Sequence, residues 1–503
     1  MFGDLMVPVT GITYDSRRVG KGDLFVALKG TKQDGGLFIR DAASRGAAAA
    51  VGEDPSGNGS ITTYVRVRDS RKALAVLAGN FFDHPSRDLR LVGITGTSGK
   101  TTTTLLLESI LATGNESVGV LGTLAYRWAG KTVPAPMTTP HSLDLQRMFA
   151  EMRKDRVSTV VMEVSSHALA LGRVAGCSFK AGVFTNLSQD HLDFHGDMEA
   201  YFQAKATLFR DYLEDVGTRS VAVVNADDPY GERLLAELGE RAWSYSASGK
   251  SARVSVKQAD LSPSGIHAVF SAPGGDLTVR SQLVGRLNLY NLLAAATTAL
   301  AMGAPKESII RGLEAVTTVD GRLQRVPIPR GLDFDVVVDY AHKPDAMEKG
   351  LKCLREMTRN RLMVVFGCGG DRDRGKRPIM GEIAARLGDL VVLTSDNPRN
   401  EVPETIVDQI EVGVRNCSFP RLGPEGPRGD EKGYAVEPDR KKAIRLALSW
   451  ARPGDVVFIG GKGHETYQII GSQVLPFDDR QVVRDYFAGE PLNGSPAAKG
   501  AGK

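Results

Sequence analysis

Short apolar runs alternate with amphipathic stretches along this chain, a pattern typical of α/β structure. Leu89–Thr95 is apolar and contains β-branched residues, which predicts a buried strand. A glycine turn follows at Gly96–Gly99, and the apolar positions within Leu105–Leu111 predict a helix that begins at Lys100. The order of strand, glycine turn and helix start is typical of a phosphate-binding loop.

The same alternation divides the chain into three units followed by a tail. Before the glycine turn, Asp23–Leu28 predicts a strand and Leu37–Arg45 a short helix, and His84-Pro85-Ser86 interrupts the pattern. We therefore predict a first unit at residues 1–87, a second at 88–325, a third at 326–492 and a flexible tail at 493–503.

Many of the predicted strands stop at a polar residue. In the third unit an apolar run ends at Gly, Asp or Asn four times, within residues 334–342, 362–371, 390–399 and 455–465. Helical sequence between such runs predicts a parallel sheet whose carboxyl edge is polar, and ligands of open α/β sheets bind beyond that edge. In the second unit the strand ends are followed by Glu163, His191 and Asp227.

Composition narrows the class of protein. A chain of 503 residues, 42% hydrophobic and 24% charged, is long enough for about three folded domains. The net charge of +4 comes from scattered basic residues, which argues against a nucleic-acid binder. The four cysteines form no CxxC pair, which argues against zinc sites and disulfides and for a reducing compartment. Without a membrane-length apolar run or a signal-like start, we expect a cytoplasmic protein.

The glycine turn carries the clearest chemistry. Gly96 and Gly99 let backbone N–H groups point at phosphate oxygens, and the helix N-terminus adds its positive dipole end. Lys100 can reach the β- and γ-phosphates, and the Thr101 hydroxyl can bind Mg²⁺. Ile94 replaces a glycine of the common pattern, but a purely structural turn rarely carries Lys-Thr at the helix start. The motif therefore predicts a nucleoside-triphosphate site.

Other residues have a structural and a functional interpretation. Glu163 and His191 follow strands, so each is either a solvated loop residue or a second contact for Mg²⁺. Asn288 and Asn291 share a helix face near its N-terminus, as caps or as adenine contacts. The Asp396-Asn-Pro-Arg399 segment is a turn by its Asn-Pro pair, and that turn could also aim the arginine.

Taken together, the motifs resemble the Mur ligase family, ATP-dependent amide-bond synthetases that build the peptidoglycan stem peptide. The resemblance spans nearly the whole chain and is greatest to members that add the third residue. The motifs are Gly96-Thr-Ser-Gly-Lys-Thr-Thr102, Glu163-Val-Ser-Ser-His167, Asn186-Leu-Ser-Gln-Asp-His191, Asp339-Tyr-Ala-His342 and Gly367-Cys-Gly-Gly-Asp-Arg-Asp373. Met137 and Leu171 stand where the family often has Asn and Gln.

The resemblance implies a three-domain α/β architecture: a UDP-sugar-binding domain, a central phosphate-loop ATPase-type domain with a parallel sheet, and a C-terminal Rossmann-like domain. It implies ATP and Mg²⁺ as cofactors and an acyl-phosphate intermediate, with catalytic roles for Lys100, Glu163, His191 and Lys205. The ATP-binding residues would be Gly96, Thr97, Ser98, Gly99, Lys100, Thr101, Thr102, Asn288, Asn291, Arg322 and Asp339. Lys205, which the sequence alone would make an ordinary helical lysine, would carry a carbamate and join Thr101, Glu163 and His191 in binding metal.

The resemblance also implies two further substrates, UDP-N-acetylmuramoyl-L-alanyl-D-glutamate and meso-diaminopimelate. The UDP substrate would contact Tyr14, Ser16, Thr31, Lys32, Gln33, Thr138, Thr139, Ser165, Leu171 and Arg173. The amino acid would contact Arg372, Asp396, Asn397, Pro398, Arg399, Gly461 and Glu465, with Arg399 forked on its distal carboxylate. L-Lysine, which lacks that carboxylate, is the alternative amino acid.

Three further alternatives stay open at this point. A switch or motor ATPase would release ADP without peptide or amine, and an inactive UDP-sugar-binding protein would need no intact phosphate loop. Folylpolyglutamate synthetase shares the ATP domain, although the unit before the phosphate loop argues against it. We expect a monomer that acts on small molecules and has no nucleic-acid or membrane-spanning function.

Overall fold

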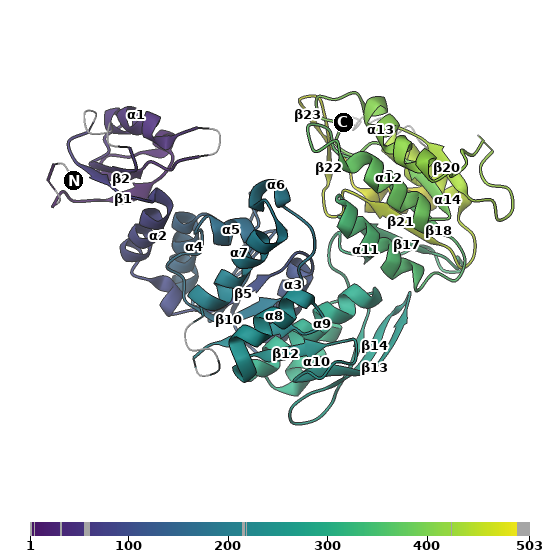
Figure 1. Cartoon of the computed structure of the whole chain (residues 1–503), viewed down its shortest axis with the longest axis horizontal. Helices are drawn as coiled ribbons and strands as arrows, with labels where there is room; N and C mark the ends of the chain where they lie inside the picture. Colours follow the sequence, from purple (N-terminus) through teal and green to yellow (C-terminus); the bar gives the residue numbers. More distant parts are fainter. Residues whose placement is uncertain are drawn as a thin grey trace, which may run out of the picture.

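The computed structural model describes residues 3–489, except residues 5, 31–32, 55–60, 214–216, 218 and 424. Thr31, Lys32 and the predicted tail at 493–503 therefore lie outside the described residues. Figure 1 shows three α/β units, with the first (purple) and the third (green to yellow) on opposite sides of the central one (teal). The α/β architecture predicted from the sequence is confirmed.

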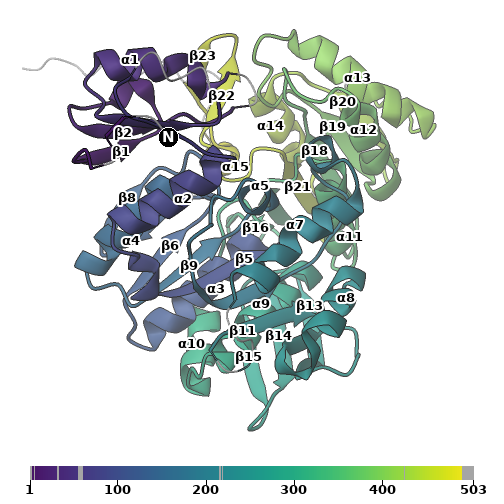
Figure 2. The same cartoon turned by 60° about the vertical axis from the view of Figure 1, so that its left-hand side comes forward.

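The first unit is a small parallel sheet in the order β1-β2-β3-β4. Apolar residues on its two faces pack beneath α1 on one side and α2 on the other. Figures 1 and 2 show α2 side by side with α4, the contact that joins this unit to the central one. Its elements are β1 Gly11–Thr13, η1 Ser16–Arg18, β2 Asp23–Val26, η2 Gly35–Phe38, α1 Ile39–Ser44, β3 Ala49–Gly52, β4 Tyr64–Arg66, α2 Ser70–Phe81 and η4 Pro85–Arg87.

The central unit is built on a mixed sheet in the order β15-β14-β13-β12-β11-β10-β5-β9-β6-β7-β8. Its middle strands, from β12 to β6, are parallel, whereas β13–β15 and β7–β8 extend the two ends with antiparallel pairs. Its strands are β5 Arg90–Thr95, β6 Val118–Leu121, β7 Tyr126–Trp128, β8 Lys131–Val133, β9 Thr159–Glu163, β10 Phe179–Phe184, β11 Val221–Asn225, β12 Trp243–Ser246, β13 Val254–Ser262, β14 Gly265–Ser271 and β15 Leu277–Ser281.

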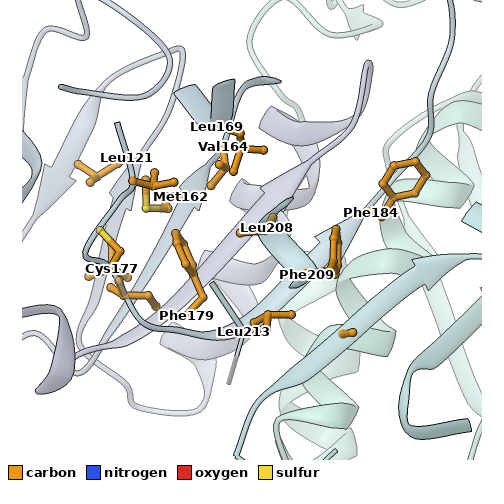
Figure 3. Close-up of a cluster of buried hydrophobic side chains, with 14 of the residues drawn as sticks. Leu121, Met162, Val164, Leu169, Cys177, Phe179, Phe184, Leu208, Phe209 and Leu213 are labelled. Carbon is orange, nitrogen blue, oxygen red and sulfur yellow. The ribbon is translucent and has the colours of Figure 1, made fainter. Parts of the chain in front are cut away.

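Helices cover both faces of the parallel part. Because side chains alternate along a strand, Leu91 of β5 packs under α4, α5 and α7, whereas Val92 and Ile94 pack under α3, α9 and α10. Figure 3 shows part of the first of these cores, where Phe179 and Phe184 of β10 lie near Leu208 and Phe209 of α7. The helices are α3 Lys100–Thr113, α4 Ser142–Lys154, α5 Ser166–Ala170, α6 Leu192–His195, α7 Met198–Asp211, α8 Pro229–Leu238, η5 Gly239–Arg241, α9 Gly285–Ala301 and α10 Lys306–Ala315.

The third unit has a sheet in the order β16-β17-β21-β18-β19-β20, parallel except for β16. Helices α11–α13 cover one face and α14–α15 the other, so the strands are buried on both sides as their apolar sequence predicts. Its elements are β16 Gln324–Arg325, β17 Asp335–Asp339, α11 Pro344–Arg355, β18 Leu362–Phe366, α12 Lys376–Leu387, β19 Leu390–Leu393, α13 Pro403–Asn416, β20 Gly433–Val436, α14 Arg440–Trp450, β21 Val456–Gly460, β22 Tyr467–Ile470, β23 Gln473–Pro476 and α15 Asp479–Phe487.

The four strands that the third unit's sequence predicts correspond to β17, β18, β19 and β21, which are neighbours in this sheet. Their polar endings therefore meet at one edge. Over the part of the chain that the structure describes, none of the helices combines the length and the apolar character needed to cross a membrane.

Candidate active site

The phosphate loop Gly96–Gly99 joins β5 to α3, as the sequence predicts. Gly96 (φ +145°) and Gly99 (φ +88°) adopt backbone conformations that favour glycine. Lys100 folds over the loop, and its Nζ donates hydrogen bonds of 2.9 Å to the carbonyls of Gly96 and Thr97. Burial lowers the pKa of the Lys100 ammonium. The loop thus has the geometry of an anion-binding site at a helix N-terminus.

Asn186, which follows β10, holds this loop in place. Its carbonyl accepts from Thr97 N at 2.8 Å, and its side chain both accepts from Ser98 N and donates to Ser98 O, each at 3.1 Å. Thr102 is buried in the first turn of α3. The loop conformation is therefore fixed by a neighbouring strand end as well as by its own glycines.

Glu163 ends β9 at the same sheet edge and is only 1% exposed. Its carboxylate accepts hydrogen bonds from the Thr101 hydroxyl (3.1 Å), Thr123 N (2.8 Å) and the Thr123 hydroxyl (3.1 Å). A carboxylate and a threonine hydroxyl side by side are oxygen ligands of the kind that Mg²⁺ prefers. The residues present thus fit a magnesium ion.

No group of three His, Cys, Asp or Glu side chains converges into a metal site among the described residues.

His191 lies beside a charged pair that crosses from the central to the third unit. Its backbone is left-handed (φ +54°), and its Nε2 lies 3.4 Å from Asp190 Oδ2 and 3.5 Å from Lys343 Nζ. Lys343 Nζ also donates to Asp190 Oδ1 at 2.7 Å. Burial lowers the pKa of His191 to about 4, so its imidazole is neutral at neutral pH and able to act as a ligand.

Lys205 is fully buried on α7, with 1% of its surface exposed. Its Nζ donates to Gly96 O at 2.8 Å and lies 4.5 Å from the centre of the Tyr201 ring. Burial, and then the charge of Lys100, hold the pKa of the Lys205 amine well below its usual range. A fully buried amine with a lowered pKa, hydrogen-bonded to the phosphate loop, is not the environment of an ordinary surface lysine.

The residues predicted for the nucleotide lie on both sides of the junction between the second and third units. On α9, Asn291 Nδ2 donates to Asn288 Oδ1 at 3.1 Å, and Asn288 Nδ2 donates to the Val284 carbonyl at 2.9 Å. Since Val284 occupies the N-cap position, the two asparagines are not N-caps of this helix. Across the junction, Leu323 N donates to Asp339 Oδ2 at 2.7 Å.

Asp339 and Arg322 form the third unit's part of this predicted nucleotide site. Burial raises the pKa of the Asp339 carboxyl to about 6, although the nearby Arg322 charge opposes the shift. The Arg322 guanidinium lies 5.1 Å from the centre of the Tyr340 ring. Asp339 thus titrates closer to neutral pH than an exposed aspartate.

Several residues predicted to line the sugar-peptide path form one cluster next to Glu163. The Thr139 hydroxyl donates to Glu163 O at 2.9 Å and lies 3.3 Å from Ser165 Oγ, while Thr138 Oγ1 lies 3.1 Å from Thr123 Oγ1. Leu171 ends α5 in the same region.

Arg173 is the cation of this cluster. Its Nη1 donates to Thr139 O at 3.1 Å and contacts the Met137 sulfur at 3.3 Å. Its buried Nε has no hydrogen-bond partner among the described residues. A half-buried guanidinium with an unpaired, buried Nε–H suits an anionic substrate group.

The residues predicted for the UDP end lie further away in the first unit. Tyr14 donates through its hydroxyl to Asp144 Oδ2 on α4, at the junction with the central unit. Ser16 begins η1 and is buried, and Gln33 accepts from Gly30 N through its carbonyl. Thr31 and Lys32 fall outside the described residues.

A cavity of about 1200 Å³ lies between the central and third units. His191 and Asp190 line it from the central side. From the third unit it is lined by six residues of the predicted amino-acid set: Arg372, Asp396, Asn397, Arg399, Gly461 and Glu465. Pro398, the seventh, is buried between two of them.

The Asp396–Arg399 segment of this cavity is tied to its neighbours by hydrogen bonds. Asn397 Nδ2 donates to Glu465 Oε2 at 2.9 Å, and Arg399 Nη1 donates to Gly370 O at 2.9 Å. Arg399 N donates to Ile469 O at 3.0 Å. Burial raises the pKa of the Glu465 carboxyl. The turn predicted from the Asn-Pro pair is thus present, and it presents charged side chains to the cavity.

The structure brings four further residues to this region that are not among the predicted site residues. Thr123 and Asn186 hold Glu163 and the phosphate loop, and Lys343 bridges Asp190 to the third unit. Lys462 is fully buried beneath Asp396. Asn186 lies within the Asn186–His191 motif and Lys343 directly follows the Asp339–His342 motif, whereas Thr123 has no local pattern that would identify it.

Comparison with known proteins agrees with this geometry. Three family models match in order along the chain: Mur ligase family, catalytic domain (residues 8–82); Mur ligase middle domain (94–299); and Mur ligase, glutamate ligase domain (321–463). A relative from Geobacter metallireducens, named UDP-N-acetylmuramoyl-L-alanyl-D-glutamate–2,6-diaminopimelate ligase, is 47% identical over 96% of this chain and 95% of its own length. One of the same name from Gloeobacter violaceus is 47% identical over 95% of this chain and 94% of its own length.

A solved structure of an enzyme with that name superposes with a TM-score of 0.68 at 32% identity, covering 96% of this chain and 95% of the other. The similarity to these proteins therefore extends through all three units, and the order of the matched models is that of the three sheets. This chain belongs to the Mur ligase family, the ATP-dependent ligases whose middle domain carries the phosphate loop described above.

Proposed function

We propose that this chain adds meso-diaminopimelate to UDP-N-acetylmuramoyl-L-alanyl-D-glutamate at the expense of ATP, in the synthesis of the peptidoglycan precursor. The observation that carries the proposal is the single cavity that joins His191, next to the phosphate loop, to the charged residues of the Asp396–Arg399 segment. The full-length relatives named for this reaction support the same substrates.

The reaction needs an activated carboxylate because a free carboxylate is a poor electrophile. The D-glutamate side-chain carboxylate attacks the γ-phosphorus of ATP, which gives an acyl phosphate and ADP. The amine of diaminopimelate then attacks the acyl carbon, phosphate leaves, and the amine loses a proton. The protein's contribution is positioning and charge stabilisation.

The phosphate loop and Lys100 would hold the β- and γ-phosphates, and Asn288, Asn291, Arg322 and Asp339 would hold the nucleoside. Mg²⁺, when bound, would neutralise charge on the transferring phosphoryl group. Thr101, Glu163 and His191 are the residues that would hold the ion, and the neutral state of His191 suits that role.

Lys205 would act as a carbamate. Burial favours the uncharged form of its amine, which is the form that attacks CO₂, and the resulting anion would face the phosphate loop, where a cation is expected. The nearby cluster around Thr139 and Arg173 would receive the acidic peptide end of the UDP substrate.

The third unit would supply the attacking amino acid. Arg399 would pair with the distal carboxylate, Glu465 and Gly461 with the distal ammonium and carboxyl groups, and Arg372 with the reacting end. We further propose that the enzyme acts as a monomer in the cytoplasm, with domain boundaries near residues 87 and 325. The four free cysteines are consistent with a reducing compartment.

The direct test is a product assay by mass spectrometry with purified enzyme, ATP, Mg²⁺, the UDP-dipeptide and one amino acid at a time. We expect one ADP and one phosphate per tripeptide formed with meso-diaminopimelate, and on the order of a thousandfold lower catalytic efficiency with L-lysine. Comparable efficiency with L-lysine would overturn the choice of amino acid. Brisk ADP release without peptide and amine would instead indicate a switch-type ATPase.

A further inference from the structure

Lys462 lies in the loop after β21, beneath the wall of the cavity, and its side chain is 0% exposed. Its Nζ donates to Asn397 Oδ1 and to the carbonyl of Tyr467, both at 2.9 Å. The same Nζ lies 3.2 Å from Asp396 Oδ1 and 4.0 Å from Glu465 Oε2. This one buried ammonium thus contacts three cavity-lining residues, Asp396, Asn397 and Tyr467, from the side away from the cavity. It also approaches a fourth, Glu465.

A second buried cation nearby provides a comparison. Arg440 is also 0% exposed and donates to Gly460 O at 3.0 Å, but it pairs with Asp479, itself 0% exposed, at 2.7 Å. Asp479 is not among the cavity residues. The charge of Arg440 is therefore neutralised inside the fold, whereas among the described residues Lys462 has ion pairs only with Asp396 and Glu465, which face the cavity.

Charged side chains of both signs surround the far end of the cavity. The carboxylates of Asp396 and Glu465 lie between Arg399, which lines the cavity, and Lys462, which pairs with them from beneath the cavity wall. The distal end of diaminopimelate carries one ammonium and one carboxylate and is neutral overall. The distal end of L-lysine carries an ammonium alone.

We infer that Lys462 is a positioning residue whose charge makes this pocket select a zwitterionic end over a cationic one. The inference rests on the proposed function and extends it to a residue that does not itself line the cavity. Without the Lys462 charge, Asp396 and Glu465 lose their buried cationic partner and the pocket becomes more negative. A more negative pocket attracts the ammonium of L-lysine more strongly and disfavours the distal carboxylate of diaminopimelate.

Lys462 also has a mechanical role, which the test must separate from its charge. Asn397 Oδ1, which accepts from Lys462, accepts as well from Ile469 N at 3.0 Å, so the β22 strand and the lysine hold the same amide. Gln468 offers a matched uncharged contact, since its Nε2 donates to Asp396 O at 2.7 Å.

The experiment is a competition assay in which one enzyme sample ligates an equimolar mixture of meso-diaminopimelate and L-lysine, and mass spectrometry measures the ratio of the two tripeptides. The ratio does not depend on how much of the sample is folded. For Lys462→Met we expect the preference for diaminopimelate to fall on the order of tenfold or more, the size of a unit charge acting over several ångströms at an effective dielectric of about 20. Lys462→Arg keeps the charge and should keep the wild-type ratio.

Two control variants separate charge from structure. Gln468→Leu removes an uncharged hydrogen bond to Asp396 O of the Asp396–Arg399 segment. It should raise the KM for both amino acids without changing the ratio of the two tripeptides. Arg361→Gln breaks a buried ion pair with Asp455 (2.6 Å) that precedes β18 and β21, at the opposite edge of the same sheet. It should lower stability and leave the ratio unchanged.

An unchanged product ratio in Lys462→Met would overturn the inference. Loss of both products would overturn it too, because the inference requires this variant to keep ligating L-lysine. If Lys462→Met is insoluble, Lys462→Gln, which also removes the charge, is subject to the same criteria. Failure of the wild-type enzyme to ligate diaminopimelate at all would refute the proposed function instead, before any variant is compared.

Discussion

Arg399 offers the most direct test of how the cavity recognises the distal carboxylate of diaminopimelate. Its backbone is fixed on both sides, because Arg399 N donates to Ile469 O at 3.0 Å and Arg399 O accepts from Gly471 N at 2.7 Å. Of the five guanidinium N–H groups, Nη1 uses one on the Gly370 carbonyl at 2.9 Å, the single hydrogen bond of this guanidinium among the described residues. The remaining donors suit a forked pair with a carboxylate.

The loss expected from Arg399→Ala follows from that geometry. A forked pair makes two charge-assisted hydrogen bonds, each worth about 1.5–3 kcal/mol net. Because the side chain is half-buried rather than sealed, we take the lower end, about 3 kcal/mol in all, which is on the order of a hundredfold in kcat/KM for diaminopimelate. Activity with L-lysine, which has no distal carboxylate, should change far less.

A second substitution tests the same contact with the arginine retained. A Cβ added at Gly369 would lie 2.9 Å from Arg399 Nη1, which is the far end of a flexible side chain. Gly369→Ala should therefore displace the guanidinium and raise the KM for diaminopimelate, with the KM for ATP unchanged. Steady-state kinetics with each amino acid measures both variants. Unchanged affinity for diaminopimelate in Arg399→Ala would refute the assignment.

Four further outcomes can be checked by kinetics. Lys100→Ala should abolish ligation, and undiminished ATP-dependent product would contradict the phosphate-loop assignment. Lys205→Ala should lose activity that acetate or bicarbonate partly restores in the presence of Mg²⁺, so a fully active alanine variant would argue against the carbamate. Because Asp339 is protonated as pH falls through about 6, the KM for ATP should rise there in the wild-type enzyme, and Asp339→Asn should not show that step. Thr123→Val removes one hydroxyl donor to Glu163 and should lower kcat by roughly tenfold; an unchanged kcat would make this contact incidental.

Much of the fold follows from local sequence. Apolar runs that end at a polar residue predicted β5, β9 and the four parallel strands of the third unit. The prediction works because a strand buried on both faces is almost continuously apolar. The antiparallel strands β13–β15 were not predicted. β14 and β15 alternate between buried and more exposed residues, and β13 is largely exposed or half-buried, so none of the three forms the continuous apolar run that marks a strand buried on both faces.

Part of the candidate site was also predictable from local sequence, and part was not. The phosphate loop was predictable because backbone, glycine and lysine act within a few residues of each other. Lys462 was not, since its role depends on Asp396 and Glu465 being folded against it, and a lysine within a glycine-rich loop has no pattern that predicts burial. Tertiary contact alone gives that side chain its environment.

The proposed chemistry requires the phosphate site of the central unit and the amine site of the third unit to lie together. Contacts at the junction between the two units hold them in that position. Lys343, at the N-cap of α11 in the third unit, binds Asp190 and lies against His191 of the central unit. Ser188, two residues before Asp190, donates through its hydroxyl to Asp345 Oδ2 of the third unit at 2.8 Å. The segment that would hold the metal is therefore positioned in part by the unit that would hold the amine. Since an acyl phosphate hydrolyses in water, contacts that hold the amine-binding unit against the metal-binding segment favour ligation over hydrolysis.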